Sequence, residues 1–222
     1  MKTLILGATG ATGSELLNLL LADNSVSSVE IFVRRKVNFN HTKLRVHIID
    51  FDRAEEWESL VKGDVLFSCL GTTLKDAGSK EAQWRVDHDY QLLFAQIAKK
   101  NNVPKYILVS SDYANSKSPL FYSRMKGVLE DEIKALQFEY TRIFNPPLLE
   151  RRNTDRLNEK MALQILKGLN KFGLFHTFRP LPTHLLAKAL LAEAKRNISG
   201  TSNIRTKEIW DVIKKQNYDI AL

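Results

Sequence analysis

The sequence predicts an α/β protein built on a doubly wound parallel sheet, with a small helical region towards its C-terminal end. Three observations support this fold class. Short apolar runs alternate with helical segments, the strand segments lack regular polar alternation, and a glycine-rich turn follows the first of them. Strands of that composition are buried on both faces, which requires helices above and below a parallel sheet.

The predicted strands and helices follow one another in a regular order along the chain. The first strand, at residues 2–8, is the apolar run KTLILGA, and the helix after it carries leucines on a broad face that can be buried. Further strands are expected at residues 28–35, 44–50, 63–71, 105–111 and 139–145, and helices at residues 14–23, 54–62, 80–101 and 120–137. Parallel strands need such crossover connections, so the order indicates a parallel sheet.

The chain changes character after Pro146 and Pro147, where helical segments predominate. Helices are expected at residues 154–169, 183–197 and 206–216, with a loop at residues 170–182. Thr154 and Thr183 are expected to be N-caps, because a threonine hydroxyl can accept a hydrogen bond from a backbone N–H of the first helical turn. This part of the chain must also supply the last element of the sheet.

Composition and charge favour a globular protein that binds anions. The chain has 222 residues, 44% of them hydrophobic, and 33 Lys and Arg against 25 Asp and Glu, which suits one core and an anionic partner. The single cysteine, Cys69, cannot form an internal disulfide, and the scattered histidines predict no metal site. The apolar run Leu4–Leu6 is too short for a signal segment, and no stretch reaches the roughly 20 apolar residues of a membrane span. We therefore expect a cytoplasmic protein.

A glycine-rich turn links the first strand to the first helix. Gly7, Gly10 and Gly13 are spaced three apart. Glycine allows backbone N–H groups and a helix N-terminus to approach a ligand closely, and a turn at this position in an α/β protein cradles the pyrophosphate of a dinucleotide. The pattern therefore predicts a Rossmann-type dinucleotide site, with a purely structural tight turn as the alternative.

The end of the second strand indicates which dinucleotide is bound. An acid there hydrogen-bonds the 2′-hydroxyl of the adenosine ribose, whereas an arginine accommodates a 2′-phosphate. This strand ends in Arg34, Arg35 and Lys36, about 20 residues beyond the last glycine, with no acid beside them. We therefore predict NADP(H) in preference to NAD(H). The alternative for these three cations is a solvated turn. Nucleic acid is not expected as a partner, because the basic stretch RRKVNFNHTKLR contains only one aromatic residue, Phe39, and no recognised nucleic-acid module surrounds it.

Serine, tyrosine and lysine residues near the fifth strand form a candidate catalytic set. Tyr122 and Lys126 are four apart in a helical segment and so share one face, and Ser110 and Ser111 end the preceding strand. A nearby cation favours the ionised form of a phenol, whose pKa is otherwise about 10. Tyr122 would exchange a proton with a substrate oxygen, while Ser111, or Ser110 as the backup, hydrogen-bonds the same oxygen. Chance helical spacing is the alternative for the pair.

Several segments together resemble an atypical short-chain dehydrogenase/reductase, specifically the Tat-interacting-protein oxidoreductase group related to the NAD-dependent epimerase/dehydratase and NAD(P)H-binding families. They are GATGATGSELL, FSCLGTT, WRVDHDY, VSSDYANSKSPLFYSRMKG, RIFNPPLL and FRPLPTHLLAKALL, in this order over nearly the whole chain. The resemblance implies a single NAD(P)-binding Rossmann-type domain over residues 1–222, in which residues 147–222 contribute a small substrate-side subregion.

The resemblance also implies a set of cofactor-binding residues. They are Gly7, Thr9, Gly10, Ala11, Thr12 and Gly13 for the pyrophosphate, Arg34 and Arg35 for the 2′-phosphate, Asp50 and Phe51 for adenine, Cys69, Leu70 and Gly71 for the ribose and nicotinamide side, and Asn145 and Pro146 for the carboxamide, with Tyr122 and Lys126 completing the set. The chain departs from the group in having Asn145-Pro146-Pro147 where Arg-Pro-Gly is usual, which alters a backbone donor. Cys69 is expected to be a pocket wall and not a nucleophile.

The predicted function is the NADP(H)-dependent reduction of a small carbonyl compound. The short region after Asn145 must supply the last sheet element and leaves only a small helical C-terminal substrate lid, which favours a reductase over a nucleotide-sugar epimerase. An anionic substrate would be favoured if four basic residues line the cleft, namely Arg151, Arg152, His176 and Arg179. Two alternatives remain open: an NADPH-sensing protein that turns nothing over, and a flavin- or quinone-reductase-like enzyme that needs no tyrosine acid. We expect a monomer or a homodimer.

Overall fold

The computed structural model describes residues 1–150 and 180–216, in which seven strands form one sheet and every neighbouring pair is parallel. The strands are β1 (Lys2–Leu6), β2 (Ser28–Val33), β3 (Leu44–Ile48), β4 (Val65–Ser68), β5 (Lys105–Val109), β6 (Tyr140–Asn145) and β9 (Gly200–Arg205). Their order in space is β3-β2-β1-β4-β5-β6-β9, so the chain winds outwards from β1 in one direction and from β4 in the other. The predicted doubly wound parallel sheet is confirmed.

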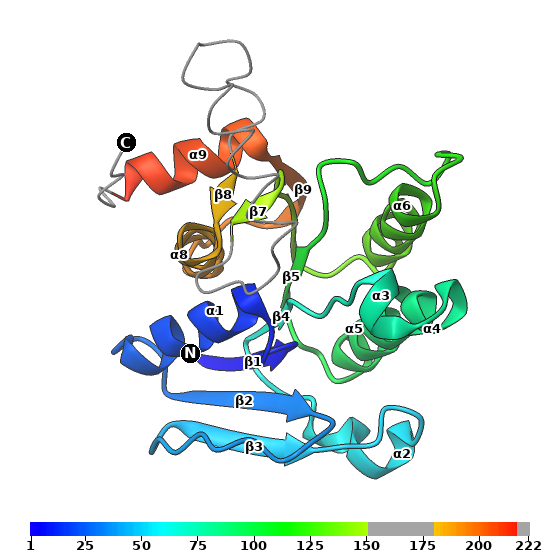
Figure 1. Cartoon of the computed structure of the whole chain (residues 1–222). Coiled ribbons are helices and arrows are strands. Elements are labelled where there is room, and N and C mark those ends of the chain that lie inside the picture. The colour runs from blue at the N-terminus through cyan, green and yellow to red at the C-terminus, as the bar shows by residue number, and fades with distance from the viewer. Residues whose placement is uncertain (151–179, 217–222) are drawn as a thin grey trace.

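Helices cover both faces of this sheet (Figure 1). One face carries α1 (Ala11–Ala22), α8 (Thr183–Ala194) and α9 (Thr206–Lys215), and the other carries α5 (Tyr90–Lys100) and α6 (Phe121–Ala135). The shorter elements are α2 (Ala54–Trp57), the 3₁₀ turn η1 (Glu58–Leu60), α3 (Leu74–Ala77), α4 (Lys80–Trp84), the π-helical turn η2 (Arg85–Asp89), and β7 (Leu149–Glu150) paired in parallel with β8 (Leu181–Pro182). None of the described helices is long and apolar enough to cross a membrane.

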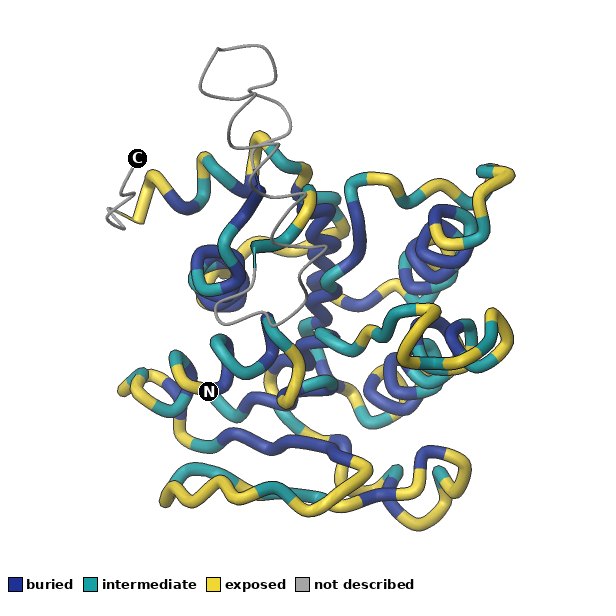
Figure 2. Tube along the Cα trace, in the orientation of Figure 1, coloured by how far each residue is buried: buried dark blue, intermediate teal, exposed yellow. Residues whose placement is uncertain are grey.

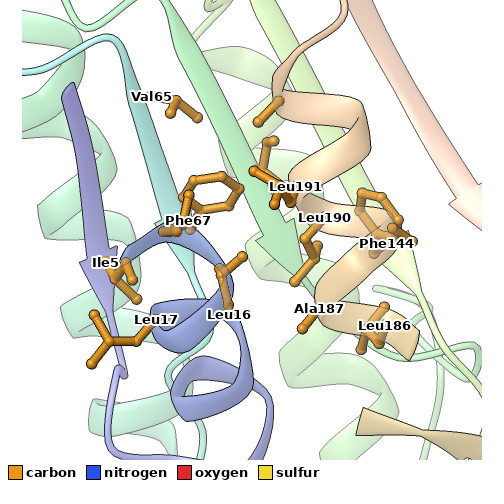
Figure 3. Close-up of a cluster of buried hydrophobic side chains, with 14 of the residues drawn as sticks. Ile5, Leu16, Leu17, Val65, Phe67, Phe144, Leu186, Ala187, Leu190 and Leu191 are labelled. Atoms are coloured by element: carbon orange, nitrogen blue, oxygen red, sulfur yellow. The ribbon is translucent and has the colours of Figure 1, made fainter. Parts of the chain in front are cut away.

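Successive residues of each central strand enter opposite hydrophobic layers, as the two-residue period of a strand requires. The layer between the sheet and helices α1 and α8 includes Ile5, Leu16, Leu17, Phe67 and Leu190 (Figure 3). The layer beneath α5 and α6 includes Leu4, Leu66, Phe94, Leu129 and Ile133. The inner strands are buried along most of their length, whereas the edge strand β3 is partly exposed (Figure 2). The lack of regular polar alternation in the strand segments reflects this two-sided burial.

Two of the predicted helices are interrupted. The helix expected at residues 54–62 is a single α-turn followed by the 3₁₀ turn η1. The helix expected at residues 80–101 contains the π-helical turn η2 between α4 and α5. A π-turn inserts an extra residue into the helical ladder, and side-chain periodicity does not reveal it.

The C-terminal region differs from the prediction at two points. Thr183 is the first residue of α8 and not its N-cap, because Pro182 is held in extended backbone by the β7–β8 pairing and occupies the cap position itself. Strand β9 had no predicted position. The helix expected at residues 154–169, with its cap Thr154, lies outside the described residues. Helices α8 and α9 pack on the sheet as part of the main fold (Figure 1).

An ion pair between Asp23 and Lys195 joins the C-terminal ends of α1 and α8. Burial alone would raise the pKa of Asp23, but Lys195 and Ser25 bind its carboxylate and lower the pKa from 3.8 to about 2. A carboxyl whose pKa is lower in the folded state stabilises the fold above its unfolded pKa, and loses that effect as the pH falls through its folded pKa.

We therefore expect Asp23→Asn to lower the free energy of unfolding by about 1 kcal/mol at pH 7, a value reduced for solvent screening. The difference from the wild type should shrink between pH 4 and pH 2, the interval set by the two pKa values. Urea unfolding at several pH values measures it, with Glu15→Gln on the same helix as the control. A difference that stays constant down to pH 2 would contradict this role of the ion pair.

Candidate functional site

The glycine turn lies at the C-terminal end of β1, pressed against the end of β4. Gly7 has a φ of +85°, and a Cβ on it would lie 2.6 Å from the carbonyl carbon of Cys69 and from the nitrogen of Leu70. A Cβ on Gly13 would lie 2.1 Å from the carbonyl oxygen of Gly7. The first glycine therefore permits the turn and the third permits the close packing of α1 on it.

The N-terminus of α1 is open for an anionic ligand. Its N-cap is Gly10, which provides no side-chain hydrogen bond to the first helical turn, and the turn contains no acidic residue. The first N–H groups of a helix have no partner within the helix and lie at the positive end of its dipole. This end of α1 therefore has the chemistry that binds a pyrophosphate.

A first cavity, of about 250 Å³, lies between the glycine turn and the end of β2. It is lined by Gly7, Thr9, Phe32, Val33, Arg34, Arg35, Val37, Phe51 and Leu70. Both arginines are exposed, and no carboxylate occurs among these described lining residues. Asp50 is not on the lining: its carboxylate faces Arg53, with 3.7 Å between Oδ2 and Nε. Of the two residues expected near adenine, Phe51 alone lines this cavity.

A second cavity, of about 240 Å³, lies on the other side of the turn and shares Leu70 with the first. Its lining is Gly10, Ala11, Thr12, Cys69, Leu70, Gly71, Thr72, Thr73, Asp76, Asp87, Val109, Ser110, Tyr122, Lys126 and Leu149. Helix α6, the strand ends of β4 and β5, and the start of α1 thus converge on one space. Most of the residues predicted for the nicotinamide side and for catalysis meet there.

Tyr122 and Lys126 lie one turn apart on α6 in very different surroundings. Tyr122 is 42% exposed, whereas Lys126 is 3% exposed and its Nζ lies 2.9 Å from Oδ1 of Asp87. Burial disfavours the ammonium, but the charges of Asp87, Tyr122 and Glu130 outweigh it and hold the pKa of Lys126 above its usual range. Lys126 is therefore a fixed positive charge in the wall of the cavity.

Asp87 is a residue of this site that the sequence alone did not reveal. It belongs to the π-turn η2, is 1% exposed, and also accepts a hydrogen bond from the backbone N–H of Thr72 at 2.8 Å. Asp87 lies in the segment WRVDHDY, but its two-residue spacing from Asp89 predicts only that these two acids do not share a helix face, and no spacing links Asp87 to Lys126. Asp89 in fact contacts His88 instead.

The two candidate serines differ in position. Ser110 lines the second cavity and donates its hydroxyl to Oε1 of Glu130 at 2.5 Å, whereas Ser111 is not on the lining. Asn145 is 3% exposed and donates to the same Glu130 oxygen at 2.6 Å and to the carbonyl of Ser111 at 2.9 Å. Pro146 accepts the N–H of Asp112 at 3.0 Å, and neither it nor Asn145 lines the first or the second cavity. Glu130 thus organises this buried corner of the site.

Other predicted features can be located as well. Cys69 lines the second cavity, and burial raises the pKa of its thiol from 9.0 to about 12, which suits a wall residue and not a nucleophile. Across residues 1–150 and 180–216, no three His, Cys, Asp or Glu side chains are grouped as metal ligands. The basic residues considered for an anionic substrate, Arg151, Arg152, His176 and Arg179, lie outside the described residues.

The fold and the site define the class of protein. A glycine turn against an open helix N-terminus, with one cavity on either side of it at the carboxyl ends of parallel strands, is the arrangement of a dinucleotide-binding α/β protein. The chain belongs to the NAD(P)H-binding family, whose sequence model matches residues 7–160. Within that family it belongs to the atypical short-chain dehydrogenase/reductases of the group that includes HTATIP2.

Two curated relatives support this assignment. The Candida albicans protein named "Protein FMP52, mitochondrial" is 30% identical over 207 residues, which cover 90% of each chain. Rat "Protein HTATIP2" is 36% identical over 149 residues, covering 65% of this chain and 61% of that protein.

Solved structures share the fold. A UDP-glucose 4-epimerase from Thermotoga maritima with UDP-glucose superposes with a TM-score of 0.70 at 13% identity, covering 99% of this chain and 84% of that chain. A short chain dehydrogenase family protein from Francisella tularensis has a TM-score of 0.64 at 14% identity, covering 93% and 98%.

Proposed function

We propose that this protein is an NADP(H)-dependent oxidoreductase that reduces a small carbonyl compound, with Tyr122 as the proton donor. The observation that carries the proposal is the second cavity, where Tyr122, Lys126 and Ser110 line a single space that begins at the glycine turn. The family assignment supports dinucleotide binding. The preference for NADP(H), the carbonyl substrate and the catalytic roles are our own inference.

The residues present fit such a cofactor. The N-terminus of α1 would hold the pyrophosphate, because the turn leaves no room for a Cβ at Gly7 and the helix lacks a side-chain cap. Arg34 and Arg35 would hold the 2′-phosphate from the wall of the first cavity. Gly71 and Leu70 would border the nicotinamide side. When bound, the cofactor supplies or accepts a hydride.

The side chains around the second cavity would handle the proton. Tyr122 would donate its phenolic proton to the substrate oxygen during reduction and take it back during oxidation. Lys126 would favour the phenolate that remains after donation, because its positive charge is fixed in the same wall. We assign the serine role to Ser110, which lines the cavity. Its hydroxyl donates to Glu130 at 2.5 Å, and it would turn from Glu130 to donate a hydrogen bond to the substrate oxygen.

A small substrate is favoured over a nucleotide sugar. The second cavity has a volume of about 240 Å³ and would also have to admit the nicotinamide, which leaves little room for a further nucleotide. The epimerase neighbour, although solved with UDP-glucose, is 13% identical and supports the fold alone. The monomeric or dimeric state is a prediction that light scattering would test. The cytoplasmic location is a prediction that cell fractionation would test, and the relative in Candida albicans has "mitochondrial" in its name.

The double variant Arg34→Ala/Arg35→Ala tests the cofactor preference. We expect its affinity for NADPH to fall about 10²- to 10⁴-fold, because charge-assisted bonds to a phosphate are worth roughly 1.5–3 kcal/mol for each of the two arginines, while its affinity for NADH changes little. Isothermal calorimetry with both cofactors measures this. The control is Lys36→Ala, since Lys36 is equally exposed but does not line the cavity.

The outcomes separate the alternatives. An equal loss for NADPH and NADH would mean that the arginines do not read the 2′-phosphate. Tighter binding of NADH than of NADPH by the wild type would overturn the preference itself. A panel of small aldehydes and ketones with the preferred cofactor then searches for turnover, and wild-type binding without any turnover would favour the sensing alternative.

A further inference from the structure

Asp87 lines the second cavity, and its carboxylate contacts two other lining residues, Lys126 and Thr72. Its side chain is almost fully buried, at 1% exposure, as is that of Lys126 at 3%. Oδ1 of Asp87 lies 2.9 Å from Nζ of Lys126, and Oδ2 accepts the backbone N–H of Thr72 at 2.8 Å. One carboxylate therefore connects α6 to the turn after β4.

Buried hydrogen bonds through Gln91 and Ser68 hold the backbone of Asp87 in the π-turn η2. The backbone carbonyl of Asp87 accepts a hydrogen bond from Nε2 of Gln91 at 2.6 Å, and Oε1 of Gln91 accepts the hydroxyl of Ser68 at 2.7 Å. Gln91 and Ser68 are fully buried. This chain of contacts fixes the backbone of Asp87 near the end of β4. Rotation of the carboxylate away from this position would leave the buried ammonium of Lys126 and the N–H of Thr72 without their partner.

The surroundings of Lys126 make a counter-ion necessary. An ammonium removed from water is strongly disfavoured unless an opposite charge compensates it. The charged and titratable groups that act on Lys126 are Asp87 from η2 and Tyr122 and Glu130 from its own helix. Of these, Asp87 makes the direct contact with the ammonium, and Glu130 is already bound by Ser110 and Asn145.

We propose that Asp87 is a positioning residue of the Tyr122–Lys126 site. Its carboxylate keeps the buried Lys126 charged over the working pH range, and its second oxygen fixes the turn at Thr72 that borders the cavity. Without Asp87, Lys126 loses its proton at a lower pH and no longer supports the phenolate of Tyr122. The inference rests on the proposed function for its catalytic consequence, but the ion pair can be tested without turnover.

The variant Asp87→Asn separates the two effects, because an amide oxygen can still accept the N–H of Thr72 but carries no charge. We expect NMR of lysine labelled with ¹³C at Cε to show Lys126 titrating at least about one pH unit lower than in the wild type, as burial is no longer opposed. The amide exchange rate of Thr72 should stay near the wild-type value. Asp87→Ala should lower the titration in the same way and also speed exchange at Thr72. Asp89→Asn, in the same π-turn but outside the cavity, is the control and should leave both unchanged.

The pH profile of turnover supplies the catalytic readout. In Asp87→Asn, kcat should fall at alkaline pH with the midpoint seen for Lys126 by NMR, where the wild type holds a plateau. If Lys126 titrates identically in the wild type and in Asp87→Asn, or if kcat falls by the same factor at every pH, the proposal is overturned. A different result is a lower Lys126 titration in Asp87→Asn together with a wild-type protein that reduces no carbonyl compound. That result would refute the proposed function and would still support the ion pair between Asp87 and Lys126.

A reciprocal variant covers the case in which Asp87→Asn does not fold. In Lys126→Gln the carboxylate of Asp87 is buried without its counter-ion, so ¹³C-labelled aspartate should show it protonating at a higher pH than in the wild type. An unchanged titration of Asp87 in Lys126→Gln would overturn the coupling between the two residues.

Discussion

Replacing Gly13 by alanine is expected to abolish dinucleotide binding and to lower the free energy of unfolding by about 2 kcal/mol or more, the cost of overpacking a tightly packed interior. The added Cβ would lie 2.1 Å from the carbonyl oxygen of Gly7 and 3.0 Å from the Cα of Ala8. Both are backbone atoms, so the contact is relieved only if α1 moves away from the glycine turn. That movement displaces the helix N-terminus to which we assign the pyrophosphate.

Ser14→Ala is the matched control for Gly13→Ala. Ser14 is on the same helical turn, and its hydroxyl makes one long hydrogen bond, at 3.3 Å, to the carbonyl of Ala11. This control should keep wild-type affinity within a few fold. The measurements are calorimetric titration with NADPH and urea unfolding. Full retention of NADPH affinity in Gly13→Ala would contradict the assignment of the glycine turn as the pyrophosphate cradle.

Tyr122→Phe is expected to lower kcat for the reduction of a carbonyl substrate by about 10²- to 10⁴-fold, the usual contribution of a positioned general acid. The affinity for NADPH and the thermal stability should remain close to those of the wild type. Tyr122 is 42% exposed and lines the second cavity through α6, so loss of its hydroxyl opens no void in the core. Steady-state kinetics with the best carbonyl substrate give the measurement.

Tyr113→Phe serves as the control for Tyr122→Phe, because Tyr113 is 60% exposed and is not on the lining of either cavity. It should leave kcat unchanged. Turnover that survives Tyr122→Phe would contradict the proton-donor role and favour a flavin- or quinone-reductase-like reaction, in which the protein only positions the nicotinamide beside an electron acceptor.

The order of elements could be predicted from the sequence where burial is two-sided. Strands β1, β2 and β4 to β6 lie inside the sheet and are buried on both faces, so apolar residues occur at consecutive positions in each of them. Strand β9 is an edge strand with the sequence GTSNIR, and only Ile204 in it is buried. A strand with one buried residue carries no hydrophobic period, which explains why the sequence did not locate it.

The site divides in the same way between local and long-range features. The glycine turn and the Tyr122–Lys126 pair are set by spacing within one turn or one helix, so both could be read directly. The partner of Lys126 comes from η2, far along the chain, and the partner of Ser110 is Glu130 on the buried face of α6. Such contacts depend on how helices pack on the sheet, and no spacing in a single segment encodes them.

Calorimetric titration of the wild-type protein with NADPH and with NADH tests the central claim most directly. The account predicts saturable binding of one NADPH per chain, tighter than the binding of NADH. Absence of binding by either dinucleotide would contradict the account, because the open N-terminus of α1, the two cavities and the arginines that follow β2 would then have no ligand in common.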